Sequence, residues 1–202
     1  MTKGILTAAA AVALLAMVPI STAAGQEMVS VGLHVGAVAP RTTLPDGGGF
    51  DGGLIGGVSL NFWRLNYFGL NGTVLYGKHS GDPGPNDAVA GQEDPSVLIY
   101  DLEAAFRWPM GGPNTRFAWF PYLGLGIGGK TYRWSEWLTG HEWDTTYSWG
   151  FTTGVEVKPS RSPVGFLLEA KRYDSHYKWH GFHIDEPIVT DWVITTGVTL
   201  SR

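Results

Sequence analysis

Apolar residues alternate with small or charged residues along most of this chain, and this period of two restricts the fold more than any other feature. In the stretch VLIYDLEAAFRW, for example, Leu98, Tyr100 and Leu102 alternate with Asp101 and Glu103. Such alternation is typical of a β-strand whose two faces meet different environments. The pattern covers eight segments, at residues 29–38, 54–63, 67–76, 97–108, 117–130, 147–158, 164–173 and 192–201. Because few stretches show helical periodicity, the sequence predicts an all-β fold.

The two faces of the predicted strands differ in kind. One face is aliphatic in the middle and aromatic at both ends, with Phe62, Phe68, Phe106, Trp108, Phe117 and Trp119 at one end and Tyr76, Tyr100, Trp149 and Trp192 at the other. The opposite face carries small residues and the charged side chains of Asp101, Glu103, Arg107, Lys130, Glu156, Lys158, Glu169 and Lys171. A soluble barrel of lipocalin type would bury its apolar face, whereas here the charged face has to point inward. Aromatic girdles around an aliphatic band are typical of a barrel that faces lipid.

Short and long connections alternate between the predicted strands. The short ones read RLN, PMGGPNTR and PSRSP, and the other four are much longer, for example GKHSGDPGPNDAVAGQEDPS. This arrangement predicts an antiparallel up-and-down barrel with an even number of strands. In such barrels the short turns and both termini lie in the periplasm, and we expect the four long loops to face the outside of the cell.

The first 24 residues predict export. Lys3 precedes the apolar run ILTAAAAVALLAMVPI, which is followed by the small residues STAA, as in a secretory signal peptide. We expect cleavage after residue 24, so that residues 25–202 form the mature outer-membrane barrel. No later segment is apolar over 18 successive residues, which argues against a transmembrane helix. The net charge of −4 and the lack of basic runs argue against a nucleic-acid partner.

The stretch PYLGLGIGG has two interpretations. Gly124, Gly126 and Gly129 match the spacing of a dinucleotide-binding turn, but that turn needs a following helix, and the next residues have no helical stripe. Alternation offers the other interpretation, with Leu125 and Ile127 on one face and Gly124, Gly126 and Gly128 on the other. In a barrel these glycines would line a crowded interior, where a missing side chain makes room for a long neighbour.

Four segments carry a family resemblance: WFPYLGLGIGG, YSWGFTTGVEVK, VGFLLEAKRY and DWVITTGVTLSR. They resemble the last four strands of the small bacterial outer-membrane β-barrel domains of the OmpA and OmpX type. The resemblance implies an eight-stranded antiparallel up-and-down transmembrane β-barrel in the cell outer membrane, surrounded by lipid and lipopolysaccharide. It implies no particular activity. Members of that family usually end in an aromatic residue, and this chain departs from the pattern by ending in Leu200, Ser201 and Arg202.

The predicted interior is narrow. Eight strands enclose a space just wide enough for side chains to fill, and buried charges have to be paired because each loses several kcal/mol of hydration. The eight charged residues of the inner face divide equally between acidic and basic ones. We therefore interpret them as a salt-bridged plug, with no catalytic role. A porin-like narrow channel is the alternative.

The long loops are the other candidate site. The third and fourth loops are predicted to form a binding surface for sugars, lipopolysaccharide or a partner protein, because amphipathic rings provide contact area at low entropic cost. Its residues are Trp134, Trp137, His141, Trp143, His176, Trp179, His180 and His183. The spacing of His176, His180 and His183 is compatible with zinc or copper, but no predicted helix aligns these side chains. We predict no metal site and no cofactor.

The sequence thus favours a non-enzymatic outer-membrane barrel that is structural, adhesion-like or surface-binding. The alternative is a lipid A-modifying enzyme, for which Ser175 and His176 with Glu169 or Asp174 form the nearest catalytic set. Adjacent residues of a strand point to opposite faces, which argues against this set. The His-x-Ser-Asn element of the deacylases does not occur in the chain.

Overall fold

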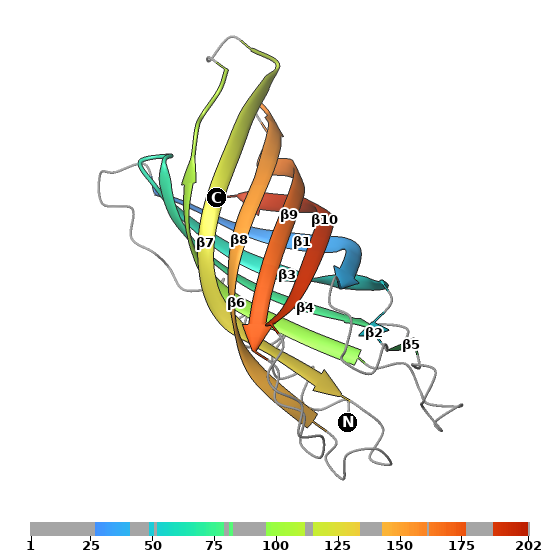
Figure 1. Ribbon diagram of the computed structural model, residues 1–202. Helices are drawn as coiled ribbons and strands as arrows, with labels where there is room; N and C mark the ends of the chain where they lie inside the picture. The colour runs from blue at the N-terminus through green and yellow to red at the C-terminus, as the bar shows by residue number, and fades with distance from the viewer. Residues whose placement is uncertain are drawn as a thin grey trace.

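The computed structural model describes residues 27–40, 49–50, 52–78, 81–82, 96–111, 115–133, 143–160, 162–176 and 188–201. They form a closed antiparallel barrel with the strand order β1-β10-β9-β8-β7-β6-β4-β3 (Figure 1). Its eight strands are β1 (Glu27–Pro40), β3 (Gly53–Arg64), β4 (Phe68–Lys78), β6 (Ser96–Arg107), β7 (Phe117–Arg133), β8 (Trp143–Pro159), β9 (Val164–His176) and β10 (Ile188–Ser201). The predicted eight-stranded up-and-down barrel is confirmed. No helix among the described residues is long and apolar enough to cross a membrane.

The barrel has two unlike ends. Short connections at residues 65–67, 108–116 and 160–163 define the turn end, and the long connections define the loop end. In outer-membrane barrels the short turns are periplasmic and the longer loops are extracellular.

The strands run further at the loop end than the alternation predicts. At the loop end β8 already begins at Trp143, and β9 continues to His176. At the turn end the strands are slightly shorter than predicted, since Tyr67 lies in a turn and Trp108 lies beyond β6. β7 and β8 have 17 residues each, more than the 9–11 that cross the apolar layer. Outside the lipid the ladder of hydrogen bonds continues while both faces meet water, so the contrast between the faces disappears from the sequence.

A second, very small sheet was not predicted. It pairs β2 (Gly49–Phe50), in the first long connection, with β5 (Gly81–Asp82), in the second. The two strands contribute only the pairs Gly49↔Asp82 and Phe50↔Gly81. This sheet joins the first two loops beside the barrel (Figure 1).

The outer wall is apolar. Leu54, Leu125 and Ile127 are 79%, 68% and 71% exposed, as is typical of the outward face of a barrel that lies in lipid. Seven of the ten predicted rim aromatics are exposed, namely Phe68, Tyr76, Tyr100, Trp108, Phe117, Trp119 and Trp149, and the other three, Phe62, Phe106 and Trp192, are half-buried. An aliphatic belt between two aromatic girdles identifies a wall that faces a bilayer.

Glycines and aromatic rings face each other across neighbouring strands. A Cβ on any of these glycines would come within 3.2 Å of the opposite ring, so the missing side chain lets the ring lie against the sheet. The pairs are Trp63↔Gly69, Tyr100↔Gly129, Tyr122↔Gly154 and Tyr173↔Gly150. The expected role of the glycines in PYLGLGIGG is confirmed at Gly124, where a Cβ would overlap the Glu103 side chain.

The turn between β3 and β4 has an unusual backbone. Its central residues Leu65 and Asn66 have φ angles of 52° and 59°, as a type I′ turn requires. Asparagine tolerates this left-handed region, but leucine meets a steric penalty there. The backbone carbonyl and Oδ1 of Asn66 accept hydrogen bonds of 3.0 and 3.1 Å from Arg107. The turn thus also closes the barrel around a buried cation.

Replacing either turn residue by glycine is expected to shift stability in opposite directions. Leu65→Gly relieves the left-handed leucine and should raise the free energy of unfolding by about 0.5–1 kcal/mol, after the entropy cost of glycine. Asn66→Gly keeps the backbone but removes the Oδ1 acceptor of Arg107, which should lower stability by about 1.5 kcal/mol. Urea titrations of the refolded protein measure both. Equal shifts for the two variants would contradict this account of the turn.

Candidate functional site

The interior of the barrel is built in three layers, which we call the turn-end layer, the central layer and the loop-end layer. In β6, for example, the inward positions run from Arg107 at the turn end through Glu103 and Asp101 to Ile99 and Val97 at the loop end. The other strands place different side chains in these layers; in β9, for example, Leu167 lies toward the turn end and Tyr173 toward the loop end. All eight charged residues of the predicted lumen network lie on inward positions, and those of the central layer contact one another directly.

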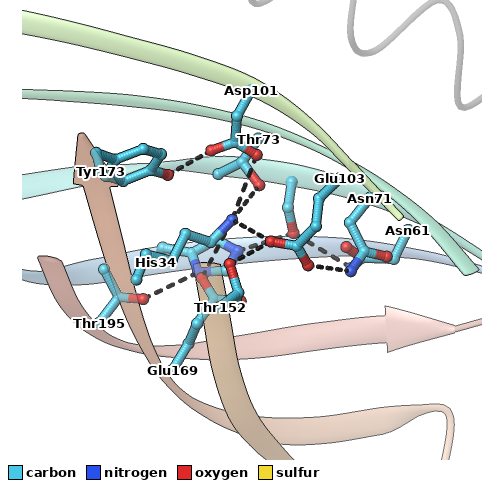
Figure 2. Close-up of polar contacts among 12 residues, drawn as sticks. His34, Asn61, Asn71, Thr73, Asp101, Glu103, Thr152, Glu169, Tyr173 and Thr195 are labelled. Carbon is cyan, nitrogen blue, oxygen red and sulfur yellow. Dashed lines mark hydrogen bonds and ion pairs between the residues drawn. The ribbon is translucent and has the colours of Figure 1, made fainter. Parts of the chain in front are cut away.

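Lys171 forms the centre of the lumen. Its side chain is 2% exposed, and its Nζ lies 3.4 Å from Asp101 Oδ1, 3.7 Å from Glu103 Oε2 and 3.6 Å from Glu169 Oε1. It also donates a 3.0 Å hydrogen bond to Thr73 Oγ1. Figure 2 shows these polar groups converging on one point from strands on opposite sides of the barrel. One cation therefore holds three carboxylates together.

Each of the three carboxylates also receives a hydrogen bond from an uncharged side chain. The Tyr173 hydroxyl donates to Asp101, and the Tyr122 hydroxyl donates to Glu169. Glu103 accepts two hydrogen bonds, one from the Thr152 hydroxyl and one of 3.1 Å from the Asn71 amide. Buried charges are tolerated only when such partners replace lost water. The donors stabilise the carboxylates beyond what a single lysine provides.

A buried histidine borders this cluster and was not predicted from the sequence. His34 is 6% exposed, and its Nε2 lies 2.8 Å from Ser59 Oγ, with Thr195 Oγ1 3.5 Å from Nδ1. Asn61 extends the chain of contacts by donating to Ser59 and Ser30. His34 lies two positions from Gly32 and Gly36 in β1, on the inward phase, and this phase was the signal that could have identified it.

The turn-end layer combines a cation with aromatic rings. The guanidinium carbon of Arg107 lies 4.2 Å from the ring centre of Trp63 and 4.8 Å from that of Phe120. Its Nη1 is 3.6 Å from Glu156 Oε2, and Glu156 accepts a hydrogen bond from Thr199. Trp63 packs edge-on against Tyr122 with ring centres 6.1 Å apart. The guanidinium thus contacts two aromatic rings and one carboxylate at the turn end.

The loop-end layer is apolar on one side and charged on the other. Buried aliphatic side chains cluster with Tyr173 on the side of β10, β1, β3, β4 and β6: Val38, Ile55, Leu75, Val97, Ile99 and Val193. From the other side, Lys130 of β7 donates a 2.5 Å hydrogen bond to Asp191 of β10, and both side chains are at most 1% exposed. The sequence prediction of a uniformly polar interior is therefore incomplete.

The central layer leaves little space beside two of its acids, Asp101 and Glu103. The gap bounded by Asp101, Glu103, Gly128 and Tyr173 is too small for a water molecule. The space is filled because Tyr173 lies flat over Gly150 and because Glu103 lies against Gly124.

The predicted loop surface falls mostly outside the described residues. This holds for Trp134, Trp137, His141, Trp179, His180 and His183. Trp143 and His176 were expected in loops, and that expectation is wrong: Trp143 begins β8 opposite Arg133, and His176 ends β9 opposite Ile188. The ladder extends to these residues because pairing continues beyond the membrane.

Two residues of the candidate catalytic set lie in a strand and not in a loop. Asp174 and Ser175, expected in the fourth loop, are residues of β9 and are each 1% exposed. Asp174 accepts hydrogen bonds from Thr190 at 2.6 Å and from Arg172 at 3.1 and 3.2 Å. Among the described residues no group of three or more histidine, aspartate or glutamate side chains is arranged to hold a metal ion.

Comparisons with known proteins find the fold but no related sequence. Neither the protein-family models nor the curated proteins give a match. Neisserial surface protein A superposes with a TM-score of 0.54 at 16% identity, over 86% of this chain and 95% of that one. Ail, the attachment invasion locus protein of Yersinia pestis, gives 0.43 at 16% identity, over 88% and 99%. The outer membrane enzyme PagL gives 0.40 at 13% identity, over 85% and 98%.

The fold and its surface together define the class of protein. A closed eight-stranded antiparallel barrel has an apolar belt outside and paired charges inside, and it shares its fold with Neisserial surface protein A. Only a bilayer covers such a belt. In fold and surface, the chain is a small outer-membrane β-barrel.

Removing the central cation tests the ionic cluster. Lys171→Met leaves Asp101, Glu103 and Glu169 without a counter-charge, and should lower the free energy of unfolding by about 3–5 kcal/mol. Arg172→Met is the comparison, since the Arg172 side chain is 47% exposed and Asp174 keeps the hydrogen bond from Thr190, so the loss should be smaller. Adding Glu103→Gln to Lys171→Met should restore part of the loss. Urea unfolding that is equal for Lys171→Met and Arg172→Met would rule out this role.

Proposed function

We propose that this protein is a non-enzymatic outer-membrane barrel with a sealed lumen, which displays its long loops for binding an extracellular ligand or surface. The observation that carries the proposal is the order of the layers inside the barrel. A charged centre around Lys171 lies between a cation–aromatic layer and an aliphatic cluster. Function is therefore assigned to the surfaces rather than to the lumen.

The packing argues against a channel. An ion would have to pass the aliphatic cluster at the loop end, displace Lys171 from its carboxylates, and then pass Arg107 between Trp63 and Phe120. Separating a buried ion pair costs several kcal/mol, and apolar constrictions exclude water and ions. An ion would have to cross all three of these barriers one after another, so the packing opposes conduction.

The burial of Ser175 argues against lipid A chemistry. An enzyme that acts on a membrane lipid needs a nucleophile that the substrate reaches, and Ser175 is 1% exposed. Its neighbour Asp174 is already occupied by Arg172 and Thr190. Ser175 and Asp174 therefore have structural roles in this proposal.

The length of β7 and β8 supports a role in display. Their 17-residue strands pair from Phe117↔Pro159 to Arg133↔Trp143, so the ladder carries the base of the third loop beyond the membrane. The loop sequence between them contains Trp134, Trp137 and His141. Aromatic residues held on a rigid support suit a binding surface, because less entropy is lost on contact.

A glycan array tests the proposal. The protein in lipid nanodiscs is applied to immobilised sugars, including lipopolysaccharide oligosaccharides, and is expected to bind a subset of them. The double variant Trp134→Ser and Trp137→Ser should weaken that binding at least tenfold, since each loses a ring contact. Trp108→Ser removes a tryptophan at the turn end, where it is exposed, and should leave binding unchanged.

Two further readouts separate the alternatives. In planar bilayers the wild-type protein should give no conductance steps, and lipid A from cells that overproduce it should keep its mass. Conductance steps would establish a channel, and altered lipid A would establish an enzyme. Binding that is unaffected by the loop variant would exclude the third loop as the binding surface.

A further inference from the structure

The lipid-facing wall has a groove near the turn end. It has a volume of about 720 Å³, and its lining is apolar apart from Arg64. The strands beneath it are β3, β4, β6, β7 and β8. The volume lies within the range of about 300–1,000 Å³ that is usual for sites that bind small molecules.

The strand register explains how the groove arises. Leu70, Ala104, Leu125 and Phe151 are successive cross-strand partners on the outer face. Ala104 is the one small side chain of this row, so the wall is hollow there between longer neighbours. The next row toward the turn end contains Phe68, Phe106 and Leu123, which are also cross-strand partners.

A positive charge stands at the turn-end edge of the groove. Arg64 is the last residue of β3, pairs with Phe68, and shares the outward phase of Phe62. Its side chain is exposed, and no ion pair involves it in the described part of the chain. The turn end is the periplasmic side, where the bilayer leaflet consists of phospholipid and its phosphates lie at the level of the strand ends.

We propose that this groove is a phospholipid site, in which one acyl chain lies over Ala104 and the phosphate of the headgroup is bound by Arg64. Lipid tails are as apolar as the groove, so burial in it gives no hydrophobic gain over the bilayer. Retention of one lipid therefore depends on close packing around Ala104 together with the charge–phosphate contact. The position at the periplasmic edge selects a phospholipid over lipopolysaccharide, which would approach from the loop end.

Native mass spectrometry tests the site. The protein is reconstituted in nanodiscs of phosphatidylglycerol and phosphatidylethanolamine, transferred to mild detergent, and weighed with any lipid it retains. The wild-type protein should carry one phospholipid. Ala104→Phe fills the floor of the groove and should reduce retention at least tenfold, and Arg64→Gln should reduce it several-fold.

Two matched variants control for general effects. Ala37→Phe enlarges another outward alanine nearer the loop end, and Arg116→Gln removes another exposed arginine at the turn end. Both should retain lipid as the wild type does. A mobility shift between unheated and boiled samples on a gel verifies that every variant is folded.

Several outcomes would overturn the proposal. Retention that is unchanged in Ala104→Phe would show that the groove holds no lipid, and unchanged retention in Arg64→Gln would remove the phosphate contact. A retained mass of lipopolysaccharide, or a dimer that Ala104→Phe abolishes, would assign the groove to a different occupant. The groove lies at the end opposite the loops, so these results are independent of glycan binding.

Discussion

Closure of the sheet is the constraint on which the rest of this structure depends. β1 pairs with β10 from Ser30↔Ser201 to Pro40↔Asp191 and with β3 on its other side, so the described barrel strands have no free edge. In lipid an unpaired backbone N–H or C=O costs several kcal/mol, which makes closure a condition of stability. Once closed, every second residue has to face lipid and every other residue has to fit a narrow interior. The sequence alternates between apolar and small or charged residues because of these two environments.

The interior solves two problems with the same residues. Eight strands leave little space, so large side chains lie over glycines, as Tyr122 does over Gly154. The charges need partners, and Lys171 finds them in carboxylates of other strands. Because Lys171 belongs to β9 and Asp101 to β6, the cluster ties together strands that share no backbone hydrogen bonds. A shift of one strand by a residue would turn its charges toward lipid, so the cluster also specifies the register.

The sequence predicts the strands well wherever the two faces contrast, as between Leu102 and Glu103. At the loop end of β6 it predicts the strand but does not distinguish the two faces, because Val97, Leu98, Ile99 and Tyr100 are all apolar. The aliphatic cluster was missed there, although its members share the inward phase of Asp101. Individual partners, such as Lys130 with Asp191, were also beyond prediction. They depend on strand tilt and stagger, which the period of two does not encode.

If the interior is sealed, as we propose, it also separates the two ends of the molecule. Coupling between distant sites needs an element with two packed arrangements of similar energy. In the described lumen a rearrangement would have to move Arg107 away from its rings or Lys171 away from its acids, and each move exposes an unpaired charge to apolar surroundings. Binding at the loops and lipid contact at the turn end are therefore expected to act independently. The barrel then serves as a rigid support, with its chemistry at the two rims.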